Sequence, residues 1–243
     1  MIGKLSLIGL LVLLPCILLA QNLVLARKIG NEVYLAADSK VAQPLVGSRK
    51  EASQATNPHC RIRTSGQFIF AVAGYIGEPS VAIVTMACQK AHSLQEAATL
   101  IEQGIQAGLE ADLSILRKQN KPAYQKLSTG ADFGGIMLCG LDKGQVEATS
   151  INWFTRKRNN EPVKVGFRMD ANSLLCIGYH KTIEYSISNP FSDIWRKPSP
   201  GGMEQLILQE AKASAQQVEG PVDIIKMDNT GRITWVKRKQ PCS

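Results

Sequence analysis

The chain has 243 residues, of which 44% are hydrophobic and 20% are charged, and its formal net charge is +8. This composition suits a globular protein with a sizeable core and excludes a long disordered chain. Six cysteines are too few for a disulfide scaffold of this length.

Residues 1–20 have the pattern of a signal peptide. Lys4 gives a short positive region, Leu5 to Leu19 form an apolar run, and Ala20 stands at a plausible cleavage point. About fifteen apolar residues are fewer than the roughly 20 that a membrane-spanning helix needs. We therefore expect cleavage after Ala20, a secreted or periplasmic location, and one domain over residues 21–243. We expect the mature chain to have no membrane association.

The positive charge is spread along the mature chain. Without Lys4 there are 27 Lys and Arg residues against 20 Asp and Glu residues, a net charge of +7. Small basic clusters occur at residues 156–158 and 237–239, but no nucleic-acid-binding motif accompanies them. We interpret the clusters as solvated loop charges and expect no nucleic-acid partner.

Residues 22–39 contain two short apolar runs with a tight turn between them. Leu23 to Ala26 and Val33 to Ala37 have strand composition, and Gly30-Asn31 can supply the positive φ of a hairpin turn. Asp38 follows the second run directly. By itself this position suits an ordinary turn or cap aspartate as well as a functional carboxylate.

The rest of the chain alternates between runs of strands and runs of helices. In chain order the predicted elements are a loop at 39–60, a hairpin of 61–63 and 67–73, helices at 78–92 and 94–116, a loop at 120–132, a hairpin of 133–140 and 145–153, strands at 163–169 and 173–178, one or two helices within 181–195, a breaker at 197–202, a helix at 203–218, and a hairpin of 222–227 and 232–237. This order predicts two packed sheets with helices outside them.

The second helix carries two features that can be tested in the structure. Ser93 and Glu96 form the pattern of a capping box at its start. Gly104 and Gly108, four residues apart, allow a second helix to approach closely. That helix belongs either to the same chain or to a neighbouring subunit, and the sequence leaves both open.

No metal or cofactor site is predicted. Five cysteines remain after signal cleavage, and they are Cys60, Cys88, Cys139, Cys176 and Cys242. Cys139 and Cys176 lie in apolar runs and are expected to be small core residues. His59, His92 and His180 are too scattered along the sequence to suggest zinc.

Three segments resemble proteasome β-type subunits of the N-terminal-nucleophile (Ntn) hydrolase superfamily. They are Leu-Ala-Ala-Asp-Ser at 35–39, Phe-Ile-Phe-Ala-Val-Ala-Gly at 68–74, and the closing hairpin segment at 220–231. They occur in the family's order and at similar spacing. The resemblance implies an α+β fold with a four-layer αββα sandwich.

The resemblance also implies positions for an active site. In that family the nucleophile is the side chain of the first mature residue, Thr, Ser or Cys, and its α-amine serves as base. The family-equivalent positions here are Asn22 for the nucleophile, Asp38 for the aspartate, His59 for the lysine, Tyr179 for a supporting serine, and Gln216 and Glu219 for the closing aspartate and serine. Only Asp38 matches. No Ser, Thr or Cys lies between Gln21 and Asp38.

The sequence therefore predicts an exported, proteasome-subunit-like protein without the N-terminal nucleophile, acting as a binding or assembly module. The alternative is an active exported peptidase or amidase with another nucleophile or processing site. A protein or peptide ligand and a homo-oligomer are the expected partners. Asp38 is expected at the inner end of its strand, near Asn22 and the segment from His59 to Arg63. There a neighbouring arginine and backbone donors would stabilise its charge. Arg61 and Arg63 are nearby cations, but a guanidinium cannot release its proton at working pH.

Overall fold

The computed structural model describes residues 22–39, 61–74, 78–127, 132–156, 164–170, 174–178, 180, 183, 199–215 and 218–239. The strands are β1 (Leu23–Ile29), β2 (Glu32–Ala37), β3 (Ile62–Ser65), β4 (Phe68–Gly74), β5 (Asp132–Asp142), β6 (Gln145–Arg156), β7 (Lys164–Asp170), β8 (Leu174–Gly178), β9 (Asp223–Asp228) and β10 (Ile233–Lys237). The helices are α1 (Glu78–Lys90), α2 (Leu94–Gln119), α3 (Lys121–Lys126) and α6 (Pro200–Ala213).

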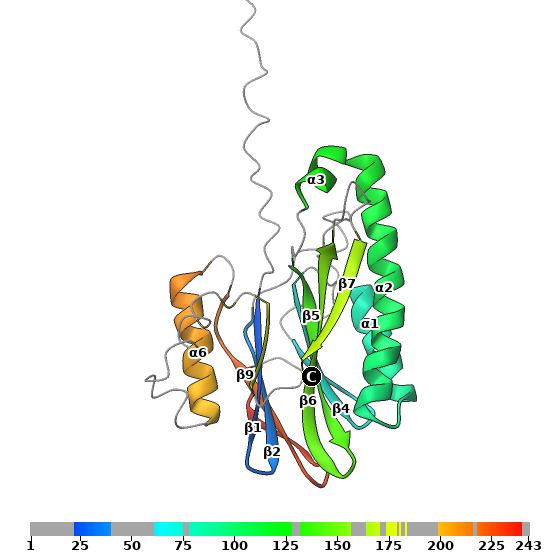
Figure 1. Ribbon diagram of the computed structural model, residues 1–243. Coiled ribbons are helices and arrows are strands. Elements are labelled where there is room, and N and C mark those ends of the chain that lie inside the picture. The colour runs from blue at the N-terminus through cyan, green and yellow to red at the C-terminus, as the bar shows by residue number, and fades with distance from the viewer. Residues whose placement is uncertain are drawn as a thin grey trace, which may run out of the picture.

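The strands form two five-stranded antiparallel sheets, seen in the middle of Figure 1. One sheet has the order β10-β9-β2-β1-β8 and the other has the order β3-β4-β5-β6-β7. The hairpin predicted in residues 22–39 pairs Val24 with Ala37 and Ile29 with Glu32. Gly30 alone of the two turn residues has a positive φ, +60°.

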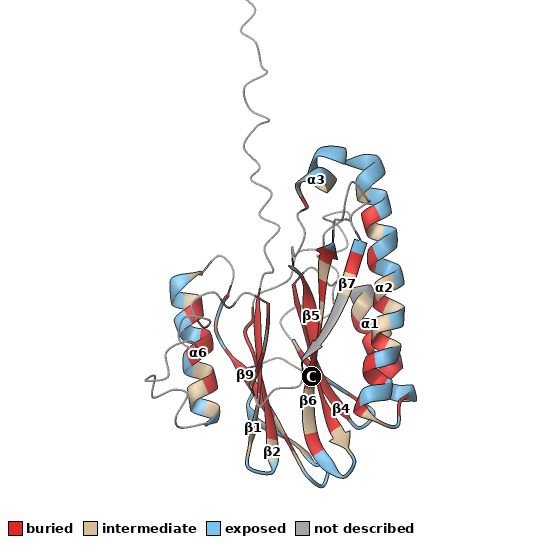
Figure 2. Ribbon diagram, viewed as in Figure 1, coloured by how far each residue is buried: buried red, intermediate tan, exposed pale blue. Residues whose placement is uncertain are grey.

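Apolar side chains from both sheets meet in a central core, and buried residues dominate the facing strands in Figure 2. This inner core contains Val24, Leu35, Ile69, Met137 and Ile225. Strand residues alternate between the two faces of a sheet. The neighbours of these inner residues therefore point outward, where helices cover them.

Different helices cover the two outer faces. On the sheet of β3 to β7, α1 and α2 cover the outer face. There the side chains of Phe70 and Trp153 share a hydrophobic cluster with Ile101 and Ile105 of α2. On the other sheet, Leu25 and Tyr34 pack against Leu206 and neighbouring residues of α6. Figure 1 shows α1 and α2 on one side of the two sheets and α6 on the other.

The predicted four-layer αββα sandwich is contradicted. Strands make up 43% of the described residues and helices 37%, and two antiparallel sheets form most of the structure. Only three described helices are longer than ten residues. Among the described residues, α6 is the one long helix that covers the sheet of β10-β9-β2-β1-β8, and one helix does not make a helical layer. The motifs behind the prediction lie at strand ends and therefore do not specify how many helices cover each sheet.

Prolines account for two differences between the predicted and observed helices. The helix predicted from Met203 begins at Pro200, because Ser199 caps it and its Oγ accepts a hydrogen bond from Gly202 N at 3.1 Å. The predicted loop after Asn120 contains α3, with Pro122 in its first turn. A helix leaves its first N–H groups without an intrahelical partner, so proline is tolerated there. Apart from Ile183, the helices expected within 181–195 lie outside the described residues.

The Ser93 cap of α2 is confirmed, while the Glu96 side chain reaches back to His92 N rather than to the N-cap residue. Glu96 N donates to Ser93 Oγ at 3.1 Å, and Glu96 Oε2 accepts a hydrogen bond from His92 N at 2.8 Å. Gly104 faces Ile83 of α1, where an added Cβ would lie 2.5 Å from Ile83 Cγ2. Gly104 thus permits a close helix pair within the chain. A Cβ added to Gly108 would have no atom of another described segment within 4 Å.

The two glycines of α2 are expected to respond differently to substitution by alanine. Gly108→Ala should stabilise the protein by about 0.5–1 kcal/mol, because alanine loses less backbone entropy in a helix and meets no neighbour. Gly104→Ala should gain less or destabilise, because its methyl group must displace Ile83. Urea unfolding of both variants measures the difference. Equal stabilisation by both substitutions would contradict the close packing at Gly104.

Candidate functional site

The candidate site lies where β1 begins and β2 ends. β4 and β8 also end there, and β5 and β9 begin there, because neighbouring strands run antiparallel. Asn22 and Asp38 are both fully buried at this end of the sheets. Buried polar side chains require hydrogen-bond partners, so their contacts indicate what the arrangement can do.

Asp38 joins two distant segments through its carboxylate. Oδ1 accepts a hydrogen bond from Leu23 N at 3.2 Å, and Oδ2 accepts one from Glu219 N at 3.1 Å. Its own backbone N donates to Leu23 O at 3.1 Å. The expected position of Asp38, beside Asn22 at the inner end of its strand, is therefore confirmed. These contacts give the carboxylate a structural role in fixing the start of β1.

The side chain of Asn22 binds a backbone donor at the site. Its Oδ1 accepts a hydrogen bond from Gly74 N at 2.8 Å, and its Nδ2 is buried with no hydrogen-bond partner among the described residues. A backbone N–H directed at this point is the kind of donor that stabilises a developing oxyanion in acyl transfer. Here the amide oxygen of Asn22 already occupies it.

Close backbone approach also shapes the site. Gly74 and Gly178 have positive φ values of +90° and +86°. A Cβ on Gly178 would lie 2.1 Å from Asn22 O, and one on Gly74 would lie 2.4 Å from Gly134 Cα. Larger residues would push these strand ends apart, so the glycines fix where the Asn22 and Gly74 backbones meet.

A buried ion pair at the start of β9 adds two residues that the sequence analysis missed. Lys239 Nζ lies 3.3 Å from Asp223 Oδ2, and their side chains are 7% and 0% exposed. Asp223 Oδ1 also accepts a hydrogen bond from Lys239 N at 2.7 Å. Burial lowers the pKa of Lys239, and the charges of Asp223 and Asp38 oppose this shift while that of Arg61 adds to it. The charges of Asp223, Asp38 and Arg61 thus all influence the pKa of Lys239.

The other family-equivalent positions contribute less. The Glu219 side chain is exposed, and its backbone N–H, rather than its carboxylate, contacts Asp38. His59, Tyr179 and Gln216 lie outside the described residues. Arg61 lies near the cluster, as expected from its position before β3. Lys239 could not be recognised in advance, because its cluster of three basic residues has the composition of a solvated tail.

The Ser39 hydroxyl and the thiols of Cys88 and Cys139 do not suit a nucleophile. Ser39, the first hydroxyl residue after Asp38, donates its Oγ proton to Glu219 O at 3.1 Å. Cys88 and Cys139 are buried, and burial raises the pKa of each thiol to about 12. These thiols stay protonated at neutral pH and are poor nucleophiles. The expectation that Cys139 is a core residue is confirmed.

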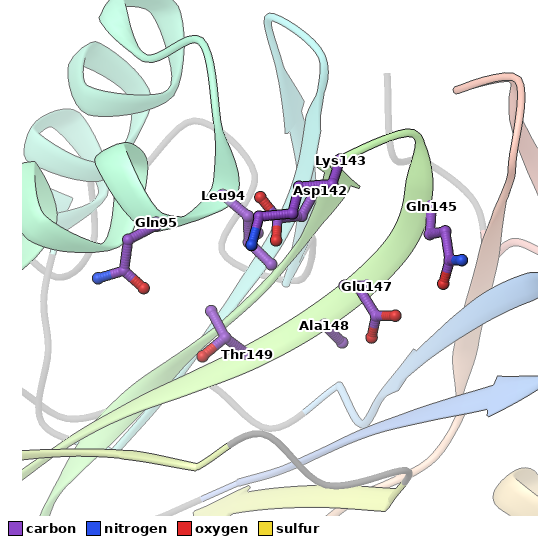
Figure 3. Close-up of a pocket in the computed structure, with 8 residues that line it drawn as sticks. All are labelled: Leu94, Gln95, Asp142, Lys143, Gln145, Glu147, Ala148 and Thr149. Carbon is purple, nitrogen blue, oxygen red and sulfur yellow. The ribbon is translucent and has the colours of Figure 1, made fainter.

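A separate pocket of about 490 Å³ lies between the start of α2 and the β5–β6 hairpin. Figure 3 shows its lining residues, which are Leu94, Gln95, Asp142, Lys143, Gln145, Glu147, Ala148 and Thr149. Glu147 is already paired with Lys28. The pocket lies at the hairpin end of the strands, and the length of β1 separates that end from Asp38 by about 20 Å. It is therefore distinct from the Asn22–Asp38 site.

Among the described residues, no group of three or more His, Cys, Asp or Glu side chains is arranged to hold a metal ion. None of the helices described is long and apolar enough to cross a membrane. No protein-family model matches the chain, and no curated protein matches it. The family resemblance therefore rests on the sequence motifs alone.

Substitutions at Asn22 should separate its hydrogen bond from its backbone strain. Asn22 has a φ of +96°, a conformation that glycine adopts readily and alanine does not. Asn22→Ala should destabilise the protein by about 2 kcal/mol, because it leaves Gly74 N–H unpaired and keeps the strain. Asn22→Gly should cost about 1 kcal/mol, since it loses the same hydrogen bond but relieves the backbone strain at this φ. Thermal unfolding measures both, and an Asn22→Ala variant as stable as the natural protein would contradict the assigned contact.

Proposed function

We propose that the protein is an exported, non-catalytic relative of proteasome β-type subunits that acts as a binding or assembly module. The observation that carries the proposal is the hydrogen bond from Gly74 N to Asn22 Oδ1. An amide side chain stands where the resemblance requires a hydroxyl or thiol, and its oxygen occupies the backbone donor beside it. The Asn22 amide is not a nucleophile, and the Gly74 N–H beside it is already occupied.

The contacts of Asp38 support the same proposal. A catalytic carboxylate would orient or charge a nucleophile or base. Both oxygens of Asp38 accept backbone N–H groups, from Leu23 and Glu219, in addition to the effect of its charge on Lys239. The carboxylate that the resemblance singled out therefore serves to hold the strand ends together.

Hydrolysis assays test the non-catalytic part of the proposal. The exported protein is incubated with a peptide library and with simple amides, and products are identified by mass spectrometry. Glu219→Ala serves as a matched variant, because its exposed side chain can be removed without removing the backbone donor to Asp38. We expect no cleavage by either protein. Cleavage that persists through further purification and increases in proportion to the protein concentration would contradict the proposal.

Light scattering tests assembly into a homo-oligomer. The net positive charge opposes self-association at low salt, and salt screens this repulsion beyond about 10 Å. An assembling protein is therefore expected to gain mass as salt and concentration increase. A monomer at every salt and protein concentration would remove the assembly role and leave a binding role.

A further inference from the structure

The hydrogen bonds around Asn22 suit a reaction of the chain with itself. When a backbone nitrogen attacks the side-chain carbonyl carbon of the asparagine before it, a succinimide ring closes and ammonia is released. The reacting atoms here are Leu23 N and Asn22 Cγ, which belong to adjacent residues, so no second molecule has to be bound and oriented. Asn22 is fully buried, and its contacts are fixed by the fold.

The amide oxygen of Asn22 is held by a backbone donor. Gly74 N donates to Asn22 Oδ1 at 2.8 Å in a buried hydrogen bond. When a nitrogen attacks Cγ, negative charge develops on this oxygen. A fixed N–H group at about 2.7–3.1 Å is the arrangement that stabilises such a charge. The contact that positions Asn22 therefore also activates its carbonyl group.

A carboxylate holds the attacking nitrogen. Leu23 N donates to Asp38 Oδ1 at 3.2 Å, and this hydrogen bond is also buried. A general base must lie within hydrogen-bond reach, about 2.6–3.2 Å, of the group whose proton it removes. The oxygen of the same peptide group, Asn22 O, packs so closely against Gly178 that an added Cβ would lie 2.1 Å from it. The peptide group is thus held on both sides.

The nitrogen that would leave is not held by the described residues. Asn22 Nδ2 is buried and has no hydrogen-bond partner among them. A buried polar group without a partner is unfavourable and calls for an explanation. Loss of Nδ2 as ammonia removes this unpaired group. The site thus binds the oxygen of the amide and leaves its nitrogen unbound, as the reaction requires.

We infer that the fold promotes deamidation of Asn22, with Asp38 as the base and the Gly74 N–H as the oxyanion donor. Leu23 N gives its proton to Asp38 Oδ1 and forms a bond to Asn22 Cγ. The proton then passes to Nδ2, and the Cγ–Nδ2 bond breaks to release ammonia and leave the succinimide. Water opens this ring to aspartate or isoaspartate at position 22.

The reaction is a modification of the chain and requires no turnover of an added substrate, so it goes beyond the proposed binding or assembly role. Its product has a new carboxylate beside Asp38. Two like charges in a buried site repel each other, and isoaspartate also lengthens the backbone where β1 begins. The modified protein is therefore expected to be less stable than the natural one.

Asn229 provides an internal comparison with a weaker base. Its Oδ1 accepts a hydrogen bond from Val146 N at 3.3 Å, and the next nitrogen, Thr230 N, donates to Asp228 Oδ1 at 2.9 Å. Hydrogen bonds, first that of the Thr230 side chain, lower the pKa of Asp228 to about 2. A carboxylate with so low a pKa accepts a proton poorly. The fold should therefore accelerate deamidation less at Asn229 than at Asn22.

Timed peptide mapping of the purified protein tests the inference. The folded protein is incubated at neutral pH, and mass spectrometry measures aspartate and isoaspartate at each asparagine. Synthetic peptides of residues 21–30 and 225–234 give the rates without the fold. The test variant is Asp38→Asn, which keeps the side-chain shape but not the base. The matched control is Glu219→Ala, which keeps the backbone donor to Asp38. Unfolding curves establish that both variants are folded during the incubation.

Asn22 should deamidate at least about 100-fold faster in the folded protein than in its peptide, since one oxyanion donor contributes about 10²–10³-fold. Asp38→Asn should slow the reaction about 100-fold, as expected for loss of a general base, and Glu219→Ala should leave it unchanged. The comparison of folded protein with peptide decides even where Asp38→Asn does not fold. A rate at Asn22 in the folded protein that is equal to or below that of the peptide would overturn the inference. So would equal rates in a folded Asp38→Asn variant and the natural protein, or a larger acceleration at Asn229.

Discussion

Asp38→Ala is expected to destabilise the protein by about 3–5 kcal/mol, because two N–H groups, one buried and one partly buried, lose a charged acceptor. These groups belong to Leu23 and Glu219, which begin β1 and precede β9. The substitution also removes a negative charge that influences Lys239. Urea unfolding, with the slope checked for two-state behaviour, measures the loss.

The control for this prediction is Glu219→Ala. Its exposed side chain is replaced while the backbone donor to Asp38 remains, so the expected change is about 0.5 kcal/mol or less. A loss of about 1 kcal/mol or less for Asp38→Ala would mean that its carboxylate does not hold the strand ends. The effect is expected in stability, with no reaction abolished.

Breaking the Asp223–Lys239 ion pair on either side is the second substitution with a large expected effect. Asp223→Asn and Lys239→Met should each cost about 3 kcal/mol, because each removes one charge of a buried pair. In Asp223→Asn the new amide oxygen can still accept the hydrogen bond from Lys239 N that Asp223 Oδ1 accepts in the natural protein. Replacing both residues should recover most of the loss, since a buried pair contributes little net stability. Additive losses in the double variant would contradict the pairing.

The same pair predicts a pH dependence. Burial lowers the folded-state pKa of Lys239 below its unfolded value of about 10.4, so the unfolded chain binds more protons between the two values. Stability from this group should therefore rise as the pH increases towards about 10.4. Burial and Glu32 raise the pKa of Tyr34 to about 12, which has the opposite effect at high pH.

Comparison with Lys239→Met isolates the contribution of the lysine, because Tyr34 is present in both proteins and its effect cancels. The stability of the natural protein relative to this variant should increase as the pH rises towards about 10.4, since only the natural protein carries the lysine that titrates. Urea unfolding of both proteins across a pH series measures the difference. A difference that stays constant or falls with increasing pH would contradict the lowered pKa of Lys239.

Local signals in the sequence were sufficient for most strands and hairpins. The two apolar runs and the turn residues of 22–39 predicted the β1–β2 pairing, and Asp38 was placed correctly because it follows an apolar strand directly. Ser93 and Glu96 predicted the start of α2, because a helix cap depends only on residues that are close in the sequence. Helix boundaries at Pro200 and Pro122 were wrong, because proline both ends and begins helices.

The charged part of the site could not be predicted, because it depends on long-range packing. Asp223 and Lys239 come together only when β9 and β10 have paired, and Arg61 reaches them from the other sheet. The contact between Asn22 and Gly74 likewise joins residues from different sheets. The number of helical layers was mispredicted because strand-end motifs carry no information about it.

The first residue of the exported protein tests the central claim most directly, since the proposed loss of the mechanism depends on what begins the mature chain. N-terminal sequencing and intact-mass measurement of protein recovered outside the cytoplasm would identify it. We predict that the chain begins at Gln21, with Asn22 second, so that neither a hydroxyl nor a thiol stands at the start of β1. A mature chain beginning with Ser, Thr or Cys would contradict the non-catalytic proposal and favour an active hydrolase.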